Sequence, residues 1–127
     1  ELPYAVAIPK TTADIKRLIE FANTNALSLI PRAAGTSLAG QCVGDGIVVD
    51  VSKYLNEILE INAQEQWVRV QPGVVRDQLN VFLKPYGFFF GPNTSTANRC
   101  TMGGMVGITL VAQRLLFMDQ LEIIRSL

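Results

Sequence analysis

The 127-residue chain contains no histidine, and this absence excludes several kinds of site. A Ser-His-Asp triad, a histidine zinc ligand and a histidine-linked cofactor all need an imidazole group. Cysteine is also scarce: Cys42 and Cys100 are too few for a disulfide framework and are typical of a reducing compartment. We therefore expect a cytoplasmic protein with no metal site and no catalytic residues of its own.

Net charge and long apolar runs are missing too. Eleven basic residues balance eleven acidic ones, which argues against a domain that binds nucleic acid through its phosphates. The most apolar stretch, residues 105–118, is interrupted by Gln113 and Arg114 and is too short to cross a bilayer. The first residues lack the basic start and apolar run of a secretory signal. The sequence predicts no nucleic-acid partner and no membrane span.

Apolar residues make up 49% of the chain, enough to build a core, and their pattern predicts a β-α-β opening. Residues 5–8 form a short apolar run that predicts a buried strand, and Thr11 and Thr12 then offer hydroxyls to cap a helix. The apolar positions of the predicted helix are Ile15, Leu18, Ile19 and Ala22. Two further buried strands are predicted at 27–30 and 46–51. Such an order favours parallel strands with a right-handed crossover.

Alternating apolar and polar residues at 58–63 and 67–71 then predict a hairpin with one buried face. An amphipathic helix is predicted at 75–84, followed by a short aromatic strand at 88–90. The inward-facing positions of this helix are predicted to be Leu79, Phe82 and Leu83. The predicted fold class is α/β (α+β), with a small, mostly parallel sheet flanked by helices.

Residues 31–41 form a loop of small residues between two predicted strands. Small side chains let successive backbone N–H groups approach a ligand, and convergent N–H groups favour an anion. Thr36, Ser37 and Gln41 add hydroxyl and amide partners. The alternative is a connecting loop that merely needs small side chains.

Two nucleotide-binding motifs are excluded for this loop. Gly35 and Gly40 have the glycine spacing of a triphosphate-binding P-loop, but Gln41 and Cys42 stand where lysine and a hydroxyl residue are required. A G-x-G-x-x-G dinucleotide fingerprint joining a strand to a helix is also absent from the sequence.

A second loop, residues 91–107, ends in closely spaced glycines and also suggests close backbone approach to a flat or charged ligand. The alternative is a surface loop that caps a helix. Cys100 in this loop is interpreted as a small packing residue, because no histidine is available to activate it as a nucleophile.

In order and spacing, the motifs resemble the FAD-binding domain shared by vanillyl-alcohol oxidase and p-cresol methylhydroxylase. The branch that looks most similar contains the D-lactate, glycolate and D-2-hydroxyglutarate dehydrogenases. The residues that carry the resemblance are P-R-A-A-G-T-S-L-A-G-Q (31–41), V-Q-P-G-V-V (70–75), G-P-N-T-S-T (91–96) and T-M-G-G-M-V-G (101–107). The resemblance implies the first lobe of such a domain, truncated.

The resemblance also implies FAD-binding positions in both loops. In the first loop residues 32–37 would wrap the FAD diphosphate and Gln41 would lie near the flavin, and in the second loop the positions would line the flavin and diphosphate. They are Arg32, Ala33, Ala34, Gly35, Thr36, Ser37, Gln41, Pro92, Ser95, Thr101, Gly103 and Gly104. The implied parent is an FAD-dependent oxidoreductase acting on a 2-hydroxy acid. The resemblance implies FAD for the parent and leaves open whether this fragment binds it. We expect the fragment to be inactive alone; the alternative is a noncatalytic nucleotide-binding or interaction module.

We expect a boundary at Gly107, with residues 1–107 as the lobe and 108–127 as a divergent apolar tail. If each codon of the tail is started one base earlier, the amino acids permit N-N-S-C-G-A-T-S-I-I-Y-G-S-T-R-D, similar to the family at this place. The tail is therefore hypothesised to be out of frame; a genuine shortened domain with a divergent helix is the alternative. Its apolar residues predict burial against the domain or a homo-oligomer.

Overall fold

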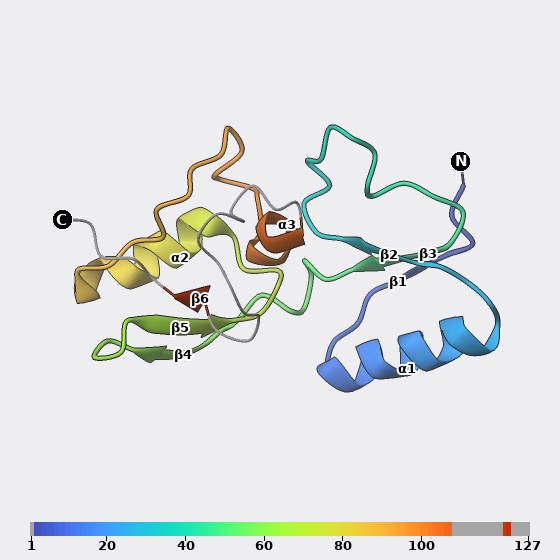
Figure 1. The fold of residues 1–127 in the computed structure, drawn as a ribbon, viewed down its shortest axis with the longest axis horizontal. Helices are drawn as coiled ribbons and strands as arrows, with labels where there is room; N and C mark the ends of the chain where they lie inside the picture. Colours follow the sequence, from blue (N-terminus) through green and yellow to red (C-terminus); the bar gives the residue numbers. More distant parts are fainter. Residues whose placement is uncertain (1, 108–120, 123–127) are drawn as a thin grey trace.

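The computed structural model describes residues 2–107 and 121–122, which divide into two lobes built around one three-stranded sheet each (Figure 1). The first lobe comprises residues 2–55, and the second lobe comprises residues 56–107 with 121–122. The chain is thus a mixed helix and strand protein with a small parallel sheet, as expected from the sequence.

The first lobe consists of β1 (Ala5–Ala7), α1 (Thr12–Thr24), β2 (Leu29–Arg32) and β3 (Ile47–Asp50). All its strands are parallel, in the order β1-β3-β2. The last strand in sequence is therefore central, and Ile47, Val48 and Val49 are buried.

The prediction that the strands near 5–8 and 27–30 are buried is wrong, although a strand forms near each place. β1 is an edge strand whose Val6 is 61% exposed, and β2 begins two residues later than expected and is at most half-buried. Strand order decides burial here, because only β3 has a neighbour on each side.

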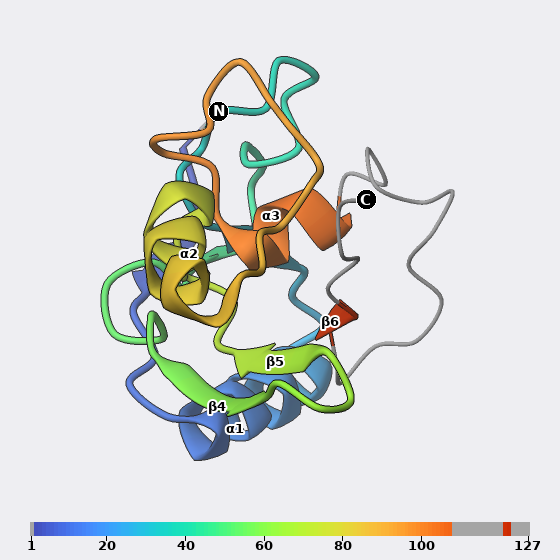
Figure 2. The ribbon, with the colours of Figure 1, turned by 90° about the vertical axis from the view of Figure 1, so that its left-hand side faces the viewer.

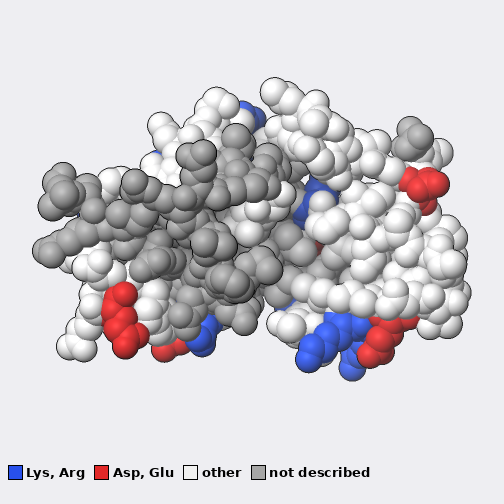
Figure 3. Space-filling view, viewed as in Figure 1, with Lys and Arg blue, Asp and Glu red and all other residues white. Residues whose placement is uncertain are grey.

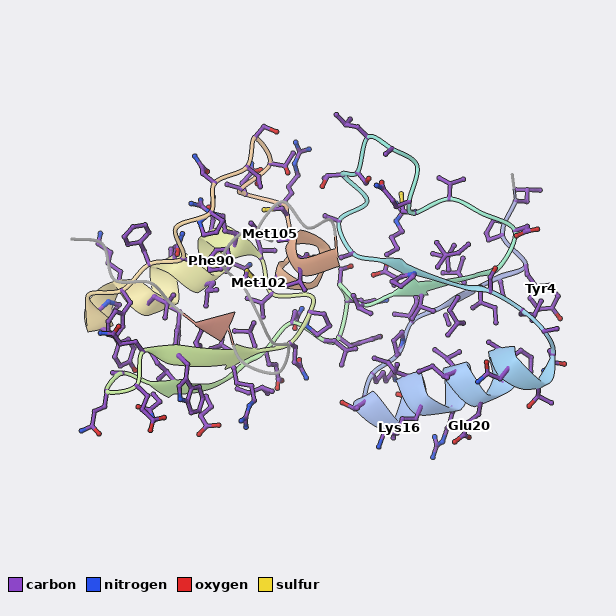
Figure 4. The ribbon with its side chains drawn as sticks, viewed as in Figure 1. Tyr4, Lys16, Glu20, Phe90, Met102 and Met105 are labelled. Carbon is purple, nitrogen blue, oxygen red and sulfur yellow. The ribbon has the colours of Figure 1, made fainter. Side chains whose placement is uncertain are left out.

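Helix α1 begins as the sequence predicts. The Thr11 hydroxyl accepts a hydrogen bond from the Asp14 N–H at 3.2 Å, and the Asp14 carboxylate accepts the Thr11 N–H at 3.0 Å. This reciprocal capping box satisfies backbone donors that the first helical turn leaves unpaired. In Figure 4 the side chains of Lys16 and Glu20 point from α1 away from the sheet.

The second lobe contains the antiparallel strands β4 (Ile58–Asn62), β5 (Trp67–Val70) and β6 (Leu121–Glu122). It also contains α2 (Arg76–Leu83), the 3-10 turn η1 (Lys84–Tyr86) and α3 (Met102–Gly107). The main core cluster lies between this sheet and these helices, where Figure 4 labels Phe90, Met102 and Met105. The buried members of the cluster are Val68, Val74, Leu79, Leu83, Phe90, Cys100, Met102 and Met105.

Two predictions for this lobe are wrong. Residues 88–90 do not form a strand; the backbone of Phe90 bonds instead to the side chain of Asn80. Phe82 is 36% exposed rather than buried, and its ring packs beside Tyr86 with ring centroids 5.8 Å apart. Cys100 is buried and free, in agreement with a packing residue.

The tail enters the described structure at β6, which pairs with β5 through Trp67–Glu122 and Val68–Leu121. These two tail residues therefore lie against the domain. The rest of the tail, for which the sequence suggested a helix in one interpretation, lies outside the described residues. Among the helices of the described residues, none is long and apolar enough to cross a membrane.

Gly73 forms the contact between the two lobes. Its N–H donates to the Leu55 carbonyl at 2.6 Å, and an ideal Cβ on Gly73 would lie 2.6 Å from the carbonyl oxygens of Leu55 and Val51. No larger residue fits at this distance without moving one lobe. The Pro-Gly pair at 72–73 therefore ends the hairpin and also packs the second lobe against the first.

Candidate functional site

Two loops project from the same side of the molecule, one from each lobe (Figures 1 and 2). The first loop, residues 33–46, joins β2 to β3, and the second loop, residues 91–101, precedes α3. In both views α3 lies below the two loops, and in Figure 1 it lies between them. The structure thus brings the two predicted cofactor-binding segments to one face, although about 50 residues separate them along the chain.

The first loop depends on two glycines in the left-handed region, Gly35 at φ +66° and Gly40 at φ +74°. An ideal Cβ on Gly35 would also lie 3.1 Å from Nε and Nη2 of Arg32. The guanidinium group therefore lies directly against the loop backbone. A positive charge at the base of the loop favours an anion there.

The backbone donors of this loop remain available. Among residues 2–107 and 121–122, none accepts a hydrogen bond from the N–H groups of residues 34–42. Buried donors are almost always paired inside a protein, but these residues are largely exposed and can serve a ligand. A run of free N–H groups beside an arginine is an arrangement suited to phosphate oxygens.

Most of the first-loop residues singled out from the sequence are accessible. Ser37 and Ala33 are half-buried, whereas Arg32, Ala34, Gly35, Thr36 and Gln41 are exposed. The Ser37 hydroxyl donates to the Gln41 side-chain oxygen, which links two polar residues in the middle of the loop. Both groups therefore face one another on the accessible side of the loop.

The second loop is folded on itself. The N–H groups of Arg99 and Cys100 both donate to the Thr96 carbonyl, at 2.8 and 2.7 Å. The Thr94 hydroxyl lies 3.1 Å from Cys100 Sγ. Ser95 is exposed at the tip and Pro92 is half-buried, so both predicted positions in this part of the loop have accessible atoms.

Three of the predicted positions lie where α3 starts, and two of them make hydrogen bonds that stabilise the fold. Thr101 is buried and its hydroxyl accepts the Gly104 N–H at 3.4 Å. Gly103 donates its N–H to the Pro72 carbonyl at 2.9 Å, and a Cβ on it would lie 2.6 Å from Pro72 Cβ. An ideal Cβ on Gly104 would meet only the Thr101 hydroxyl, at 3.4 Å, among the described residues. Their contact with FAD stays a prediction.

The described residues contain no cluster of three or more metal-ligating side chains (His, Cys, Asp or Glu). On the face shown in Figure 3, Lys and Arg are scattered or adjoin acidic groups, in keeping with the zero net charge. The chemistry of the site is therefore that of backbone donors, hydroxyls and one close arginine.

Sequence reasoning missed two residues of α2 that hold the second loop. Arg76 Nε donates to the Pro92 carbonyl at 2.9 Å, and Asn80 Oδ1 accepts the Phe90 N–H at 2.6 Å. Both residues read as ordinary polar positions of an amphipathic helix. Their partners are 16 and 10 residues away, so the local pattern carries no signal for either contact.

The fold is shared with a solved enzyme. The structure matches alkyldihydroxyacetonephosphate synthase with a TM-score of 0.69 and 20% sequence identity, over 79% of this chain and 21% of that one. A profile of the family described as FAD binding domain matches residues 3–122. The chain therefore belongs to the FAD-binding domain family.

Several curated proteins are similar in sequence. D-2-hydroxyglutarate dehydrogenase of Haemophilus influenzae is 51% identical over 109 residues, which are 84% of this chain and 11% of that protein. D-lactate dehydrogenase [cytochrome] of Kluyveromyces lactis is 37% identical over 93 residues, covering 70% of this chain and 16% of that protein. Glycolate oxidase subunit GlcD of Bacillus subtilis is 32% identical over 106 residues, covering 83% of this chain and 23% of that protein.

The chain spans between a tenth and a quarter of the length of these relatives. The family profile reaches residue 122, beyond the boundary at Gly107 that we expected for the resemblance.

Proposed function

We propose that this chain is the FAD-binding part of an FAD-linked oxidoreductase, and that the first loop holds the cofactor's diphosphate. The free N–H groups of residues 34–42 beside Arg32 carry the proposal, because they form a cradle that suits an anion. Thr36 and Ser37 supply hydroxyl donors next to it, and the second loop, which contains Pro92 and Ser95, lies on the same side of the molecule.

For the parent protein we propose a 2-hydroxy acid as substrate, because the similar proteins are named for D-2-hydroxyglutarate, D-lactate and glycolate. The flavin, when bound, accepts the hydride equivalent, and the protein supplies orientation and electrostatics. The described residues hold the cofactor in this proposal and carry no group for the substrate. We therefore expect the isolated chain to bind FAD without oxidising any of these three acids.

Two glycines provide a matched test. Gly40 in the first loop and Gly87 after η1 both have φ +74° and open space around an added Cβ. Gly40→Ala and Gly87→Ala should therefore cost similar stability, about 1 kcal/mol each. Only Gly40→Ala should weaken FAD binding, by about tenfold. Alanine disfavours φ +74°, and a backbone that leaves this conformation turns an N–H away from the diphosphate, which loses one hydrogen bond to a charged group.

The measurement is a titration of each purified variant with FAD, followed by flavin fluorescence, together with the shift in melting temperature. Equal FAD affinity in the two variants would show that the first loop does not form the cradle. A parallel titration with ADP addresses the noncatalytic nucleotide-binding module: ADP binding as tight as FAD binding would favour that alternative.

We further propose that the tail mediates a homo-oligomer and that the protein is cytoplasmic. The apolar composition of residues 108–127 supports the first, and the free Cys42 and Cys100 support the second. A monomeric mass by light scattering at micromolar concentration would contradict the oligomer. Fractionation of cells that produce the protein tests its location.

The hypothesis of an out-of-frame tail is tested by the nucleotide sequence. Codons after Gly107 that cannot encode the shifted peptide would overturn it.

A further inference from the structure

Both ends of the second loop meet at one residue, Arg76, the first residue of α2. Its backbone N–H donates to the Cys100 carbonyl at 3.0 Å, and its side-chain Nε donates to the Pro92 carbonyl at 2.9 Å. The segment 93–99 is therefore closed into a loop by two hydrogen bonds from a single residue.

The Arg76 side chain is itself held in place. It is only 14% exposed, and its Nη1 pairs with the Asp77 carboxylate at 3.0 Å. A guanidinium group is planar, so a partner on Nη1 also fixes the direction in which Nε donates. The contact to Pro92 is thus directional, and a flexible ammonium group does not reproduce it.

Asn80 continues the attachment one helical turn later. Its Oδ1 accepts the Phe90 N–H at 2.6 Å, and its Nδ2 donates to the Phe90 carbonyl at 3.4 Å. Residues 76 and 80 lie on the same face of a helix. The chain from Phe90 to Pro92 therefore runs along α2, and the loop starts from a defined position.

We propose that Arg76 is a positioning residue for the cofactor, which closes the second loop before FAD binds. The inference rests on the proposed function, in which Pro92 and Ser95 contact the cofactor. A loop that is already closed loses less conformational freedom on binding, so the ligand binds more tightly. Arg76 does not touch the cofactor in this proposal; it acts through the loop.

The test compares Arg76→Lys with Arg69→Lys in the full chain. Arg69 forms an exposed ion pair with Glu60 at 3.0 Å and has a side chain 45% exposed, so it controls for the same chemical change. Lysine at 76 keeps the positive charge but loses the donation from Nε. The measurements are FAD affinity, melting temperature, and hydrogen–deuterium exchange of the ligand-free protein.

Arg76→Lys should weaken FAD binding about tenfold, the cost of one charge-assisted hydrogen bond. It should also speed amide exchange in residues 91–101 while leaving residues 33–46 unchanged. Arg69→Lys should change neither. Unchanged exchange in 91–101, or exchange that rises evenly over the whole chain, would overturn the proposal.

The experiment separates the proposal from the proposed function. If the wild-type chain binds no FAD, the proposed function of this chain fails, and selective exchange in 91–101 still supports loop closure by Arg76. If wild type binds FAD and Arg76→Lys binds it equally well despite faster exchange, the positioning role is overturned while the proposed function stands.

Discussion

The first lobe and the second lobe present their loops on the same side, yet they bury very different amounts of side chain. The largest fully buried side chains of the described residues all belong to the second lobe: Leu79, Leu83, Met102, Val68 and Val74. In the first lobe burial is concentrated in β3, and on α1 Ile19 is 46% exposed. Stability resides mainly in the second lobe.

The difference extends to how each loop is shaped. The first loop takes its form from glycines with positive φ and from Arg32 beneath it. The second loop is held by side chains of α2 and by backbone bonds of residues 72–76 to the start of α3. In the well-packed second lobe, side chains of a neighbouring helix hold the loop. In the less buried first lobe, the loop conformation depends on the loop's own backbone.

The largest expected effect tests the difference in packing. Leu79→Ala should lower the free energy of unfolding by about 3–4 kcal/mol, because Leu79 is fully buried in the core cluster. Ile19→Ala on α1 should cost less than about 1 kcal/mol. Urea unfolding of both variants measures this, and equal costs would contradict the larger contribution of the second lobe to stability.

The next effect concerns the joint between the lobes. Gly73→Ala places a Cβ against the carbonyls of Val51 and Leu55 and should cost about 1–3 kcal/mol through overpacking. Gly91→Ala is the control, since its Cβ would make an ordinary 3.7 Å contact with Phe89. Thermal unfolding compares the two, and a harmless Gly73→Ala would show that the lobes are not joined tightly there.

A smaller effect is expected at the helix starts. α1 begins with a side-chain cap, whereas Val75 at the start of α2 makes no such bond. Thr11→Ala should destabilise the protein by about 1 kcal/mol. Urea unfolding, with Thr12→Ala as a neighbouring control, measures the loss. Similar losses for both variants would contradict a stabilising role of the Thr11 cap.

The smallest effect is a dependence on pH. The N–H of Lys10, followed by the hydroxyl and N–H of Thr11, lowers the pKa of Asp14 below its ordinary value. A carboxyl whose pKa is lower in the folded state stabilises the protein above the unfolded pKa of about 4. That contribution is lost as the pH falls through the folded pKa. The gap in stability between wild type and Asp14→Asn should therefore shrink below pH 4; a gap independent of pH would contradict it.

Several elements were predictable because their signals are local. The helix after Thr11, the helix near 76–83 and the hairpin follow from the spacing of apolar residues, together with a capping threonine for the first helix. The conformation of the aromatic run at 88–90 could not be predicted, because its backbone bonds to a side chain from α2. The exposure of β1 could not be predicted either, because the local sequence does not determine strand order.

The sequence by itself determined the local conformations and the two small-residue loops, since glycine content, capping residues and periodicity act over a few neighbours. The tertiary structure alone decided that both loops lie on one face, that Gly73 joins the lobes, and that Arg76 closes the second loop. These depend on contacts between residues distant in sequence, where close approach at Gly73 and the reach of the Arg76 guanidinium group set the geometry. The described residues of the two loops offer backbone donors, hydroxyls and arginine.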